Sequence, residues 1–430
     1  MTAALRIAVA GLGTVGAGTL ALLQANHEMI AARCGRLLQV TAVAARDRNK
    51  KRGVDLSAAR WFDDPVAMAA DPEVDVVLEL IGGADGIAKE IVERAIAAGK
   101  HVVTANKALI AHHGTALARQ AEAAGRVLAF EAAVAGGIPA IKCVREGLAA
   151  NRISRIYGIL NGTCNYILTT MRETGREFDD VLSEAQRLGY AEADPSFDVD
   201  GIDAAHKLAI LAALAFGSEV DFAGVHVEGI RQVTALDIAY ADELGYRIKL
   251  LGLARKVNNG IEQRVHPSMV RAEAPIATVD GVFNAVAAEG DFVDSIMTEG
   301  RGAGAGPTAS AVVADLIDIA RGIHLPTFAM PVERLRRLPS LQMEHHEGAY
   351  YVRLMVLDQP GVIADVSAAL RDAQISMEAM LQRGRAPGEA VPVVITTHDT
   401  REANMTEALR RIQALGTVLE PPRMIRIEAL

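Results

Sequence analysis

The segment from residue 189 to residue 207 holds a dense cluster of ionisable side chains. Five acids precede one lysine in it, namely Glu192, Asp194, Asp198, Asp200, Asp203 and then Lys207. Asp203 and Lys207 are four residues apart, so on a helix they share one face. Lys207 runs directly into the apolar stretch LAILAALAF, which predicts a buried face where an unpaired ammonium is costly. The carboxylates offer what an amino-acid substrate needs, groups that hold its ammonium.

A plainer interpretation treats the same residues as structural. Asp200 would then cap a helix that begins at Gly201, and Asp203 would be a first-turn acid. The pair between Asp203 and Lys207 would be a surface ion pair worth less than about 1 kcal/mol. The apolar run after Lys207 favours the functional interpretation, because it predicts burial.

A glycine-rich turn, GLGTVG, directly follows the first apolar run and opens a helical stretch. Strand, turn and helix in this order are the context of a dinucleotide fingerprint, in which backbone N–H groups and the helix N-terminus bind the pyrophosphate. The residues expected there are Gly11, Gly13, Thr14, Val15 and Gly16. A glycine turn without a ligand is the alternative.

The end of the second predicted strand bears on the choice of dinucleotide. An acid there would bond the ribose 2′-hydroxyl of NAD, whereas an arginine would favour the 2′-phosphate of NADP. The sequence offers both, Arg46 and Asp47, one residue apart. Further cations at Lys50, Lys51 and Arg52 favour NADP, with Arg46 as its ligand, but NAD and a merely solvated loop stay open.

These segments need a scaffold, and the chain predicts an α/β one. The first 140 residues alternate short apolar runs with helical stretches, which is typical of a parallel sheet. Strands are expected at RIAVAG, VTAVAA, DVVLEL, HVVTAN and RVLAFEA, and helices at residues 15–34 and 86–99. We therefore expect a Rossmann dinucleotide-binding domain over residues 1–140, completed by a helix at about 308–322.

The alternation weakens from about Ile141. RISRIYGILNG predicts a strand of a second sheet and GIDAAHKLAILAALAFG a buried helix, so residues 141–307 are expected to form an α+β catalytic and dimerisation domain. A proline-containing, charged stretch at 323–348 is predicted to be a linker. Residues 349–430 then show the order strand, helix, strand, strand, helix, strand, which is that of a ferredoxin-like fold.

Composition and charge exclude several classes of protein. The net charge is −9 with a pI near 5.7 and there is no basic tract, so no nucleic-acid partner is expected. No apolar run reaches the roughly 20 residues of a membrane helix, and glycines interrupt the first one, which predicts a strand rather than a leader. Cys34, Cys143 and Cys164 are far apart and without a C-x-x-C motif, which fits a reducing compartment. A cytoplasmic protein is expected.

Several segments together resemble the homoserine dehydrogenase family. The acid–Asp-Pro entry and the Gly-x-Asp-x-x-x-Lys helix start at 192–207 are similar to that family's signature, with Ala193 where the family often has proline. The likeness covers residues 1 to about 325 through TANK (104–107), EAAVAGGIP (131–139), GILNGTCNYIL (158–168) and GRGAGAGPTAS (300–310). It implies NAD(P)-dependent interconversion of L-homoserine and L-aspartate 4-semialdehyde in threonine, methionine and isoleucine biosynthesis. With no room for a fused aspartate kinase, a monofunctional enzyme is expected.

The resemblance also implies roles for single residues. Lys207 would be the general acid/base, and Lys107, at the carboxyl edge of the sheet, would be its neighbour. The remaining assignments are Glu192, Asp203 and Gly189 to the substrate, Asp198 to the support of Lys207, and Thr104, Lys107 and Gly304 to the cofactor.

A monovalent-cation site, for sodium or potassium, is a further implication of the resemblance. Its ligands would be Glu131 and the main-chain carbonyls of Val134, Gly136 and Ile138, and such hard oxygens suit the ion. From the residues alone, a glycine-rich turn that binds no ion is at least as good an interpretation.

The last 80 residues resemble an ACT domain, with the turn Asp358-Gln-Pro-Gly361 between the first strand and helix. In that family this turn helps to bind a small amino acid, often between two paired domains. Feedback inhibition by threonine is our hypothesis, and a domain that only dimerises the chain is the alternative. A homodimer or homotetramer is expected.

Two other functions compete with this interpretation. Cys164 could be the nucleophile of an aldehyde dehydrogenase, but no histidine lies near it in sequence to act as its base, and a lone cysteine among small residues is more often packing. A non-catalytic sensor could bind a dinucleotide and an amino acid. Binding alone, however, leaves Lys207 and Lys107 unexplained.

Overall fold

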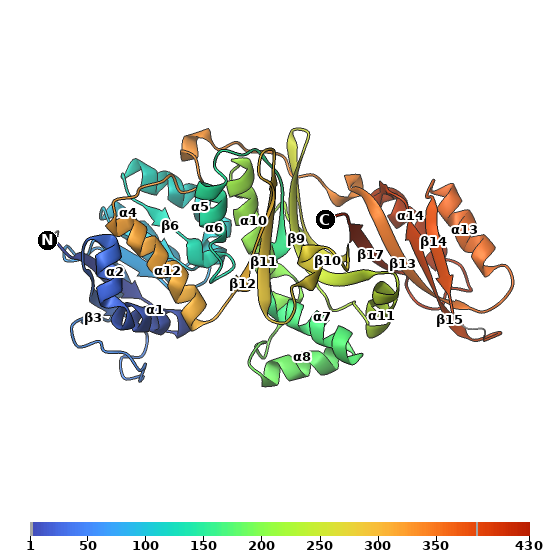
Figure 1. Ribbon diagram of the computed structural model, residues 1–430, viewed down its shortest axis with the longest axis horizontal. Helices are drawn as coiled ribbons and strands as arrows, with labels where there is room; N and C mark the ends of the chain where they lie inside the picture. Colours follow the sequence, from blue (N-terminus) through green and yellow to red (C-terminus); the bar gives the residue numbers. More distant parts are fainter. Residues whose placement is uncertain (1–2, 384–385) are drawn as a thin grey trace.

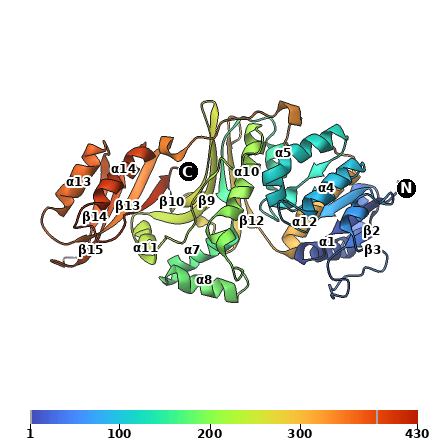
Figure 2. The ribbon, with the colours of Figure 1, turned by 180° about the vertical axis from the view of Figure 1, so that it is seen from behind.

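The computed structural model describes residues 3–383 and 386–430. The molecule is elongated (Figure 1). A helix–sheet–helix layer from the amino-terminal third forms one end, a second sheet lies in the middle, and the carboxyl-terminal segment forms the other end. The view from behind shows the same order of parts (Figure 2).

The first sheet is parallel throughout, with the strand order β3-β2-β1-β4-β5-β6. This is the order of dinucleotide-binding doubly wound sheets, so the Rossmann prediction is confirmed. Its strands are β1 (Leu5–Ala10), β2 (Leu38–Ala44), β3 (Arg60–Phe62), β4 (Val76–Glu79), β5 (His101–Thr104) and β6 (Leu128–Ala129). Its helices are α1 (Thr14–Ala25), α2 (His27–Cys34), α3 (Pro65–Ala69), α4 (Ile87–Ala97), α5 (Lys107–Ala123) and, from far along the chain, α12 (Ala305–Ala320).

Local details of this layer depart from the sequence prediction. The helix expected at 15–34 is interrupted at Asn26, which ends α1 and precedes α2. Strand β3 was not predicted. Helix α12 begins three residues before the expected position. It packs so closely on α1 that a Cβ at Gly18 would lie only 2.7 Å from the carbonyl oxygen of Ala305. This contact places the start of α12 beside the glycine-rich turn.

The second sheet has the strand order β12-β11-β7-β9-β10-β17-β13-β15-β14. The strands of its middle part are β7 (Ile153–Ile159), β8 (His226–Val227), β9 (Tyr246–Val257), β10 (Gly260–Arg271), β11 (Phe283–Gly290) and β12 (Asp294–Arg301). The strands of its carboxyl-terminal part are β13 (Glu347–Leu357), β14 (Met377–Gln382), β15 (Ala390–Thr397), β16 (Thr400–Arg401) and β17 (Arg423–Glu428). The short strands β8 and β16 pair with β10 and β13.

Helix α10 connects the two sheets, since it contacts α5 of the first layer and β7, β9 and β10 of the second sheet. The helices of this part are α6 (Ala140–Lys142), α7 (Gly162–Thr174), α8 (Phe178–Arg187), α9 (Ser196–Val199), α10 (Ile202–Phe216) and α11 (Ala235–Glu243). Short 3-10 or π turns occupy Glu131–Ala133, Cys143–Gly147, Pro275–Thr278, Val332–Arg334 and Met343–His345. Within residues 3–383 and 386–430, no helix combines the length and the apolar character needed to cross a bilayer.

The carboxyl-terminal segment has the predicted ferredoxin-like order, with α13 (Val362–Asp372) and α14 (Glu402–Gln413) on one side of β17-β13-β15-β14. Its sheet is not separate, however. Strand β17 pairs in parallel with β10, so the two sheets merge into one. Two buried ion pairs stabilise the same junction. They join Arg264 to Glu428 at 2.8 Å and Arg353 to Asp237 at 2.6 Å.

The segment predicted as a linker, residues 323–348, is packed rather than free. Phe328 is fully buried and lies against Phe130, with 5.4 Å between ring centroids. Glu122 accepts hydrogen bonds from the backbone N–H groups of Thr327 and Val332. The segment therefore ties α5 to the second sheet. Strand β13, the first strand of the carboxyl-terminal segment, begins at Glu347, earlier than the predicted boundary at residue 349.

Candidate active site

A cavity of about 590 Å³ opens where the carboxyl ends of β1 and β5 face the start of α10. We call it the carboxyl-edge cavity. Ligands of doubly wound sheets bind at this edge. The cavity brings together predicted residues from distant segments, namely Val15, Lys107, Gly136, Gly189, Glu192, Asp198, Asp203, Lys207 and Gly304.

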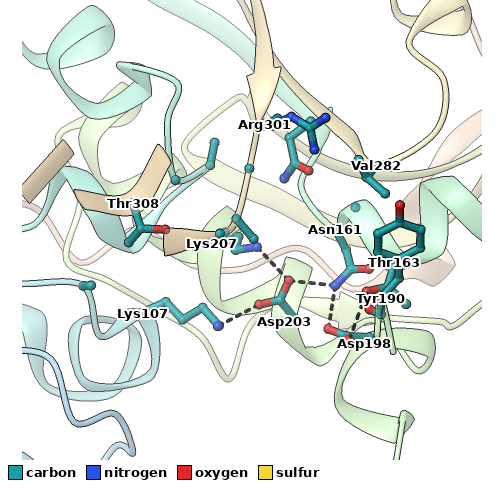
Figure 3. Close-up of a pocket in the computed structure, with 18 of the residues that line it drawn as sticks. Lys107, Asn161, Thr163, Tyr190, Asp198, Asp203, Lys207, Val282, Arg301 and Thr308 are labelled. Atoms are coloured by element: carbon teal, nitrogen blue, oxygen red, sulfur yellow. Dashed lines mark hydrogen bonds and ion pairs between the residues drawn. The ribbon is translucent and has the colours of Figure 1, made fainter. Parts of the chain in front are cut away.

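Asp203 lies at the centre of the ionisable groups in this cavity (Figure 3). Its Oδ2 accepts a hydrogen bond from Nζ of Lys207 at 2.7 Å, and its Oδ1 lies 3.1 Å from Nζ of Lys107. The residue is 4% exposed. Burial alone would raise the pKa of Asp203, but the ammonium groups of Lys207 and Lys107 hold it well below its ordinary range. The ionised carboxylate therefore holds both lysines at one point of the cavity.

The position of Lys207 follows from the way α10 begins. Gly201 precedes the helix with a φ of +85°, a left-handed conformation that favours glycine. The predicted pair of Asp203 and Lys207 is confirmed, and so is the burial of Lys207, which is 8% exposed. Its Nζ also donates a hydrogen bond to the carbonyl oxygen of Leu160 at 2.6 Å. The ammonium is thus compensated on two sides and open toward the cavity.

The predicted helix cap at Asp200 is wrong. No side chain caps α10, and the carboxylate of Asp200 instead lies 2.5 Å from Nε of Arg231 at the surface. The left-handed Gly201 turns the chain between Asp200 and the helix, which carries the Asp200 carboxylate away from the free N–H groups.

Lys107 reaches the same carboxylate from the first sheet. It is the first residue of α5, and Asn106 caps that helix by accepting a hydrogen bond from the N–H of Leu109 at 3.1 Å. The side chain of Lys107 is one-third exposed, and its Nζ lies 5.5 Å from the ring centroid of Phe197. Lys107 therefore enters the cavity from its solvent side, opposite the buried Lys207.

Asn161 forms a further layer of support behind Asp203. Its Nδ2 donates to Oδ2 of Asp203 and to Oδ1 of Asp198, both at 2.8 Å (Figure 3). Thr163 donates to the other oxygen of Asp198 at 3.3 Å. Burial, and then the charge of Asp203, raise the pKa of Asp198. The resemblance implied that Asp198 supports Lys207, but no hydrogen bond or ion pair joins the two directly. Asp198 is connected to Lys207 through Asn161 and Asp203.

The glycine-rich turn has the geometry that a pyrophosphate requires. Gly11 has a φ of +97°, and a Cβ there would lie 2.6 Å from the carbonyl oxygen of Leu80. A Cβ at Gly16 would lie 2.0 Å from the carbonyl oxygen of Gly11, so the turn can close only with glycine. A Cβ at Gly13 would meet nothing within 4 Å, which leaves open space in front of the uncapped N-terminus of α1. These residues fit a dinucleotide.

Thr104 and Arg46 lie outside the cavity wall, as do all residues of the glycine-rich turn except Val15. Thr104 is fully buried, and its hydroxyl donates to Oε2 of Glu79 at 2.7 Å, so it joins the ends of β4 and β5 while Ala105 lines the cavity. Arg46 is exposed just beyond the end of β2. Gly304, by contrast, lines the cavity and precedes α12 with a φ of +114°.

Comparisons with known proteins show which family has this arrangement. Three family models match, described as homoserine dehydrogenase (residues 139–317), homoserine dehydrogenase, NAD binding domain (residues 11–131) and ACT domain (residues 350–417). A homoserine dehydrogenase of Pseudomonas aeruginosa is 49% identical over 99% of each chain.

The chain belongs to the homoserine dehydrogenase family.

Solved structures of homoserine dehydrogenases agree with this. The crystal structure of a homoserine dehydrogenase from Thiobacillus denitrificans has a TM-score of 0.94 and 49% identity, covering 99% of this chain and 98% of that one. A hyperthermophilic archaeal homoserine dehydrogenase in complex with NADPH has a TM-score of 0.63 and 27% identity, covering 73% and 97%. As a homoserine dehydrogenase, the protein is an NAD(P)-dependent oxidoreductase that acts on a CH–OH group and interconverts L-homoserine and L-aspartate 4-semialdehyde.

Cys164 does not have the properties of a nucleophile in this homoserine dehydrogenase. The thiol is fully buried and donates to the carbonyl oxygen of Asp198 at 3.2 Å. Burial, and then the charge of Asp198, raise the pKa of Cys164 well above its ordinary value. A thiol in this state is unreactive, so the thioester mechanism is wrong for this site.

The sequence prediction missed several residues that line the cavity of the homoserine dehydrogenase: Asn161, Thr163, Tyr190, Asn284 and Arg301. A signal existed for Asn161, since asparagine before a helix is a common N-cap. Its Oδ1 accepts the N–H of Cys164 at 2.8 Å, which turns its Nδ2 toward the two carboxylates. Asn284 and Arg301 come from the β11–β12 hairpin. Arg301 belongs to the segment GRGAGAGPTAS that carried the resemblance, whereas nothing in the sequence around Asn284 indicates a site.

The expected cation ligands of the homoserine dehydrogenase form a buried turn beside the cavity. Glu131 is 1% exposed, and its carboxylate accepts hydrogen bonds from the N–H groups of Ile141 at 3.0 Å and Lys142 at 2.8 Å. Burial, and then the charge of Asp315, raise the pKa of Glu131 to about 8. A cation beside Glu131 would offset the cost of burying its charge, and the carboxylate and the three backbone carbonyls are hard oxygen donors of the kind that such an ion prefers.

Proposed function

We propose that Lys207 is the general acid/base of the homoserine dehydrogenase reaction. The observation that supports it is the Asp203 carboxylate, which holds the Nζ groups of Lys207 and Lys107 inside the cavity that the glycine-rich turn also borders. In the oxidation of homoserine, neutral Lys207 accepts the proton of the C4 hydroxyl while the C4–H bond breaks. In the reduction, its ammonium donates that proton to the aldehyde oxygen. The nicotinamide, when bound, accepts or supplies the hydride.

Asp203 acts in this scheme as a positioning residue rather than as the substrate ligand that the resemblance implied. Both of its oxygens are engaged by lysine ammonium groups, and Asn161 holds the carboxylate from behind. Lys107 then faces the substrate from the solvent side and polarises its oxygen. Asp198 keeps Asn161 in the orientation that this arrangement needs.

Glu192 is the group that we assign to the substrate ammonium. It lies on the exposed wall of the cavity next to Gly189, and its carboxylate makes no ion pair with any residue in the described part of the chain. Its backbone is fixed, because Gln186 donates to the carbonyl oxygen of Glu192 at 3.0 Å. A free carboxylate at the mouth of a cavity with two lysines inside matches a substrate with an ammonium at one end and an oxygen at the other.

The test of this mechanism is the variant Lys207→Ala. A positioned acid/base contributes about 10²- to 10⁴-fold, so we expect kcat to fall by at least 10²-fold while NADPH affinity stays within about twofold. Lys256→Ala, which removes an exposed lysine of the β9–β10 hairpin, is the matched control and should keep full activity. If Lys207→Ala retains kcat within about threefold of the original, Lys207 is not the acid/base.

NADP is the cofactor that we propose this enzyme prefers. The carboxylate of Asp47 accepts the N–H groups of Asn49 at 2.8 Å and Lys50 at 3.2 Å, so it is engaged in its own turn and not directed at a ribose. Arg46 is exposed with no ion pair in the described residues, and the NADPH complex of the archaeal relative supports the same choice. We expect Arg46→Ala to lower kcat/KM for NADPH at least tenfold and to leave NADH unchanged. Arg33→Ala, which removes an exposed arginine at the end of α2, is the matched control and should leave kcat/KM for NADPH unchanged.

A sodium or potassium ion is proposed to bind at Glu131 and the carbonyls of Val134, Gly136 and Ile138. It would neutralise the buried carboxylate and stabilise the turn that carries Gly136 into the cavity wall. We expect the chlorides of sodium or potassium to raise the melting temperature more than tetramethylammonium chloride does. Glu131→Gln should abolish that difference.

The ACT domain is proposed to carry feedback inhibition by threonine. Its turn at 358–361 ends with Gly361, which precedes α13 with a φ of +99° and leaves open space around the position of a Cβ. Gly361→Ala in the full-length chain should weaken inhibition by threonine and preserve the uninhibited rate.

A homodimer or homotetramer is proposed as the assembly, to be measured by light scattering. A cytoplasmic location stays a prediction.

A further inference from the structure

A second cavity, of about 870 Å³, lies at the opposite end of the first sheet. We call it the amino-edge cavity. It is bordered by the amino ends of β1 and β5 and by the end of α12. Figure 1 shows this first sheet and α12 at the end of the molecule where the chain begins. The side chains with ionisable groups in its wall are Arg6, Arg36, Asp75, Lys100, His101, Arg126, Arg321 and His324.

The charges in this wall are strongly unbalanced. Asp75 is the only carboxylate among the described lining residues, and Arg6 occupies it with hydrogen bonds of 2.8 and 3.1 Å. No described residue forms a hydrogen bond or an ion pair with the side chains of Arg36, Lys100 or Arg126. The cavity is therefore a concentrated positive region in a protein whose net charge is −9.

Two guanidinium groups here have buried donors without partners. Nε of Arg36 and Nε of Arg126 are buried and make no hydrogen bond. Buried polar atoms in native proteins are nearly always hydrogen-bonded, and an unmatched donor calls for an explanation. Burial lowers the pKa of Lys100, and the charges of Arg6 and Arg126 act in the same direction, whereas Asp75 opposes them. The two guanidinium groups therefore have hydrogen-bonding capacity that no described residue uses.

We propose that the amino-edge cavity binds a small polyanion, namely a phosphorylated metabolite with two or more negative charges. Guanidinium groups match phosphate oxygens with paired N–H donors, and Arg36 and Arg126 are free to do so. The cavity volume lies within the roughly 300–1,000 Å³ of small-molecule sites. A concave site with free arginines favours a compact phosphate ester over an extended chain.

His101 adds a neutral donor to this set. The N–H of Val127 donates to its Nδ1 at 3.0 Å, which leaves the ring proton on Nε2. Burial, and then His324 and Arg126, lower the pKa of His101 to about 4, so the ring is uncharged near neutrality. The ring of His324 lies 5.0 Å away. His101 can therefore donate a hydrogen bond from Nε2 to an anion, in addition to the charges of the arginines.

The amino-edge cavity is separate from the cofactor site. Strand β1 begins at Leu5 in the wall of the amino-edge cavity and ends at Ala10, next to the glycine-rich turn. At about 3.3 Å per residue, roughly 17 Å of buried strand lies between them. A ligand here would not compete with the dinucleotide.

The test is calorimetric titration of the full-length enzyme with sodium pyrophosphate. Saturating NADPH must be present, because pyrophosphate could otherwise bind at the glycine-rich turn. We expect one binding site per chain, an affinity that falls as sodium chloride is raised, and at least tenfold weaker binding by the double variant Arg36→Gln/Arg126→Gln. Sodium acetate, a monoanion, should bind at least tenfold more weakly than pyrophosphate.

The matched control is Arg371→Gln/Arg410→Gln, which removes two exposed arginines from the distant ACT domain and should bind pyrophosphate normally. The cavity variant should keep its melting temperature and its kcat/KM without pyrophosphate, since neither arginine borders the carboxyl-edge cavity. The proposal is overturned if the original enzyme shows no binding, if both double variants bind equally, or if an oligo-aspartate peptide binds and pyrophosphate does not. None of these outcomes depends on Lys207.

Discussion

Asp203→Asn isolates the positioning role of the central carboxylate. The change keeps the size of the side chain and removes the charge that holds Lys207 at 2.7 Å and Lys107 at 3.1 Å. Lys207 then keeps only neutral acceptors, among them the carbonyl oxygen of Leu160, in a site where it is 8% exposed. Asn161 also loses one of its two carboxylate acceptors.

The size of the effect follows from the burial of the pair. Removing one partner of a buried ion pair costs about 3–5 kcal/mol, because the remaining charge is left uncompensated. The contribution of Lys107 is small, since its side chain is one-third exposed and screened by solvent. If about 3–4 kcal/mol of this loss appears in the transition state, kcat falls about 10²- to 10³-fold. KM for aspartate semialdehyde should change less than about threefold, because Asp203 does not bind the substrate in this scheme.

The assay follows NADPH oxidation with aspartate semialdehyde, with NADPH affinity measured separately by fluorescence. Asp203→Glu restores the charge and should recover at least tenfold of the lost kcat. Asp200→Asn is the matched control: it removes the same charge three residues away, where the carboxylate pairs with Arg231 at the surface, and should stay within about twofold. If Asp203→Asn keeps kcat within about fivefold, or if Asp200→Asn loses as much, the positioning argument is refuted.

Three further results are expected. Asp237→Ala should lower the free energy of unfolding by about 3–5 kcal/mol in urea, because Arg353, paired with it at 2.6 Å, is left buried and uncompensated; a change below about 1 kcal/mol would contradict this. Gly13→Ala should fold with an unchanged melting temperature yet bind NADPH at least tenfold more weakly, whereas Gly16→Ala, with no room for a Cβ, should lower the melting temperature itself. His101, whose pKa falls from 6.5 to about 4 on folding, contributes stability above pH 6.5 that is lost as the pH falls toward 4, up to about 3 kcal/mol. His101→Gln should therefore flatten the stability–pH curve in that window, and an unchanged slope would count against it.

Much of the fold could be predicted because buried strands and amphipathic helices leave periodic signals. The strands of the first sheet other than β3 were found as continuous apolar runs, as expected for strands covered on both faces. Strand β3, Arg60–Phe62, is too short and too close to charged residues to give such a signal. The pairing of β10 with β17 could not be found, because it consists of backbone hydrogen bonds between strands far apart in the chain.

The candidate site divides in the same way. The pair of Asp203 and Lys207 was predictable, because both residues lie on one turn of one helix. The bridge made by Asn161 was not, since it depends on how the start of α7 faces the start of α10. The packing of the segment predicted as a linker could not be predicted either, because it depends on hydrogen bonds from Thr327 and Val332 to Glu122, which lies far away in the chain.

The sequence by itself determined the family, the glycine-rich turn and the identity of the two lysines, because each of these depends on local order along the chain. Only the tertiary structure decided that Lys107, from the first sheet, and Lys207, from α10, meet on the two oxygens of one carboxylate. It also decided that Arg36, Lys100 and Arg126 share one cavity, in which their side chains form no hydrogen bond or ion pair with a described residue. Charges separated by tens of residues act on one another only when burial brings them within a few ångströms in a region of low dielectric constant, and packing alone sets that distance.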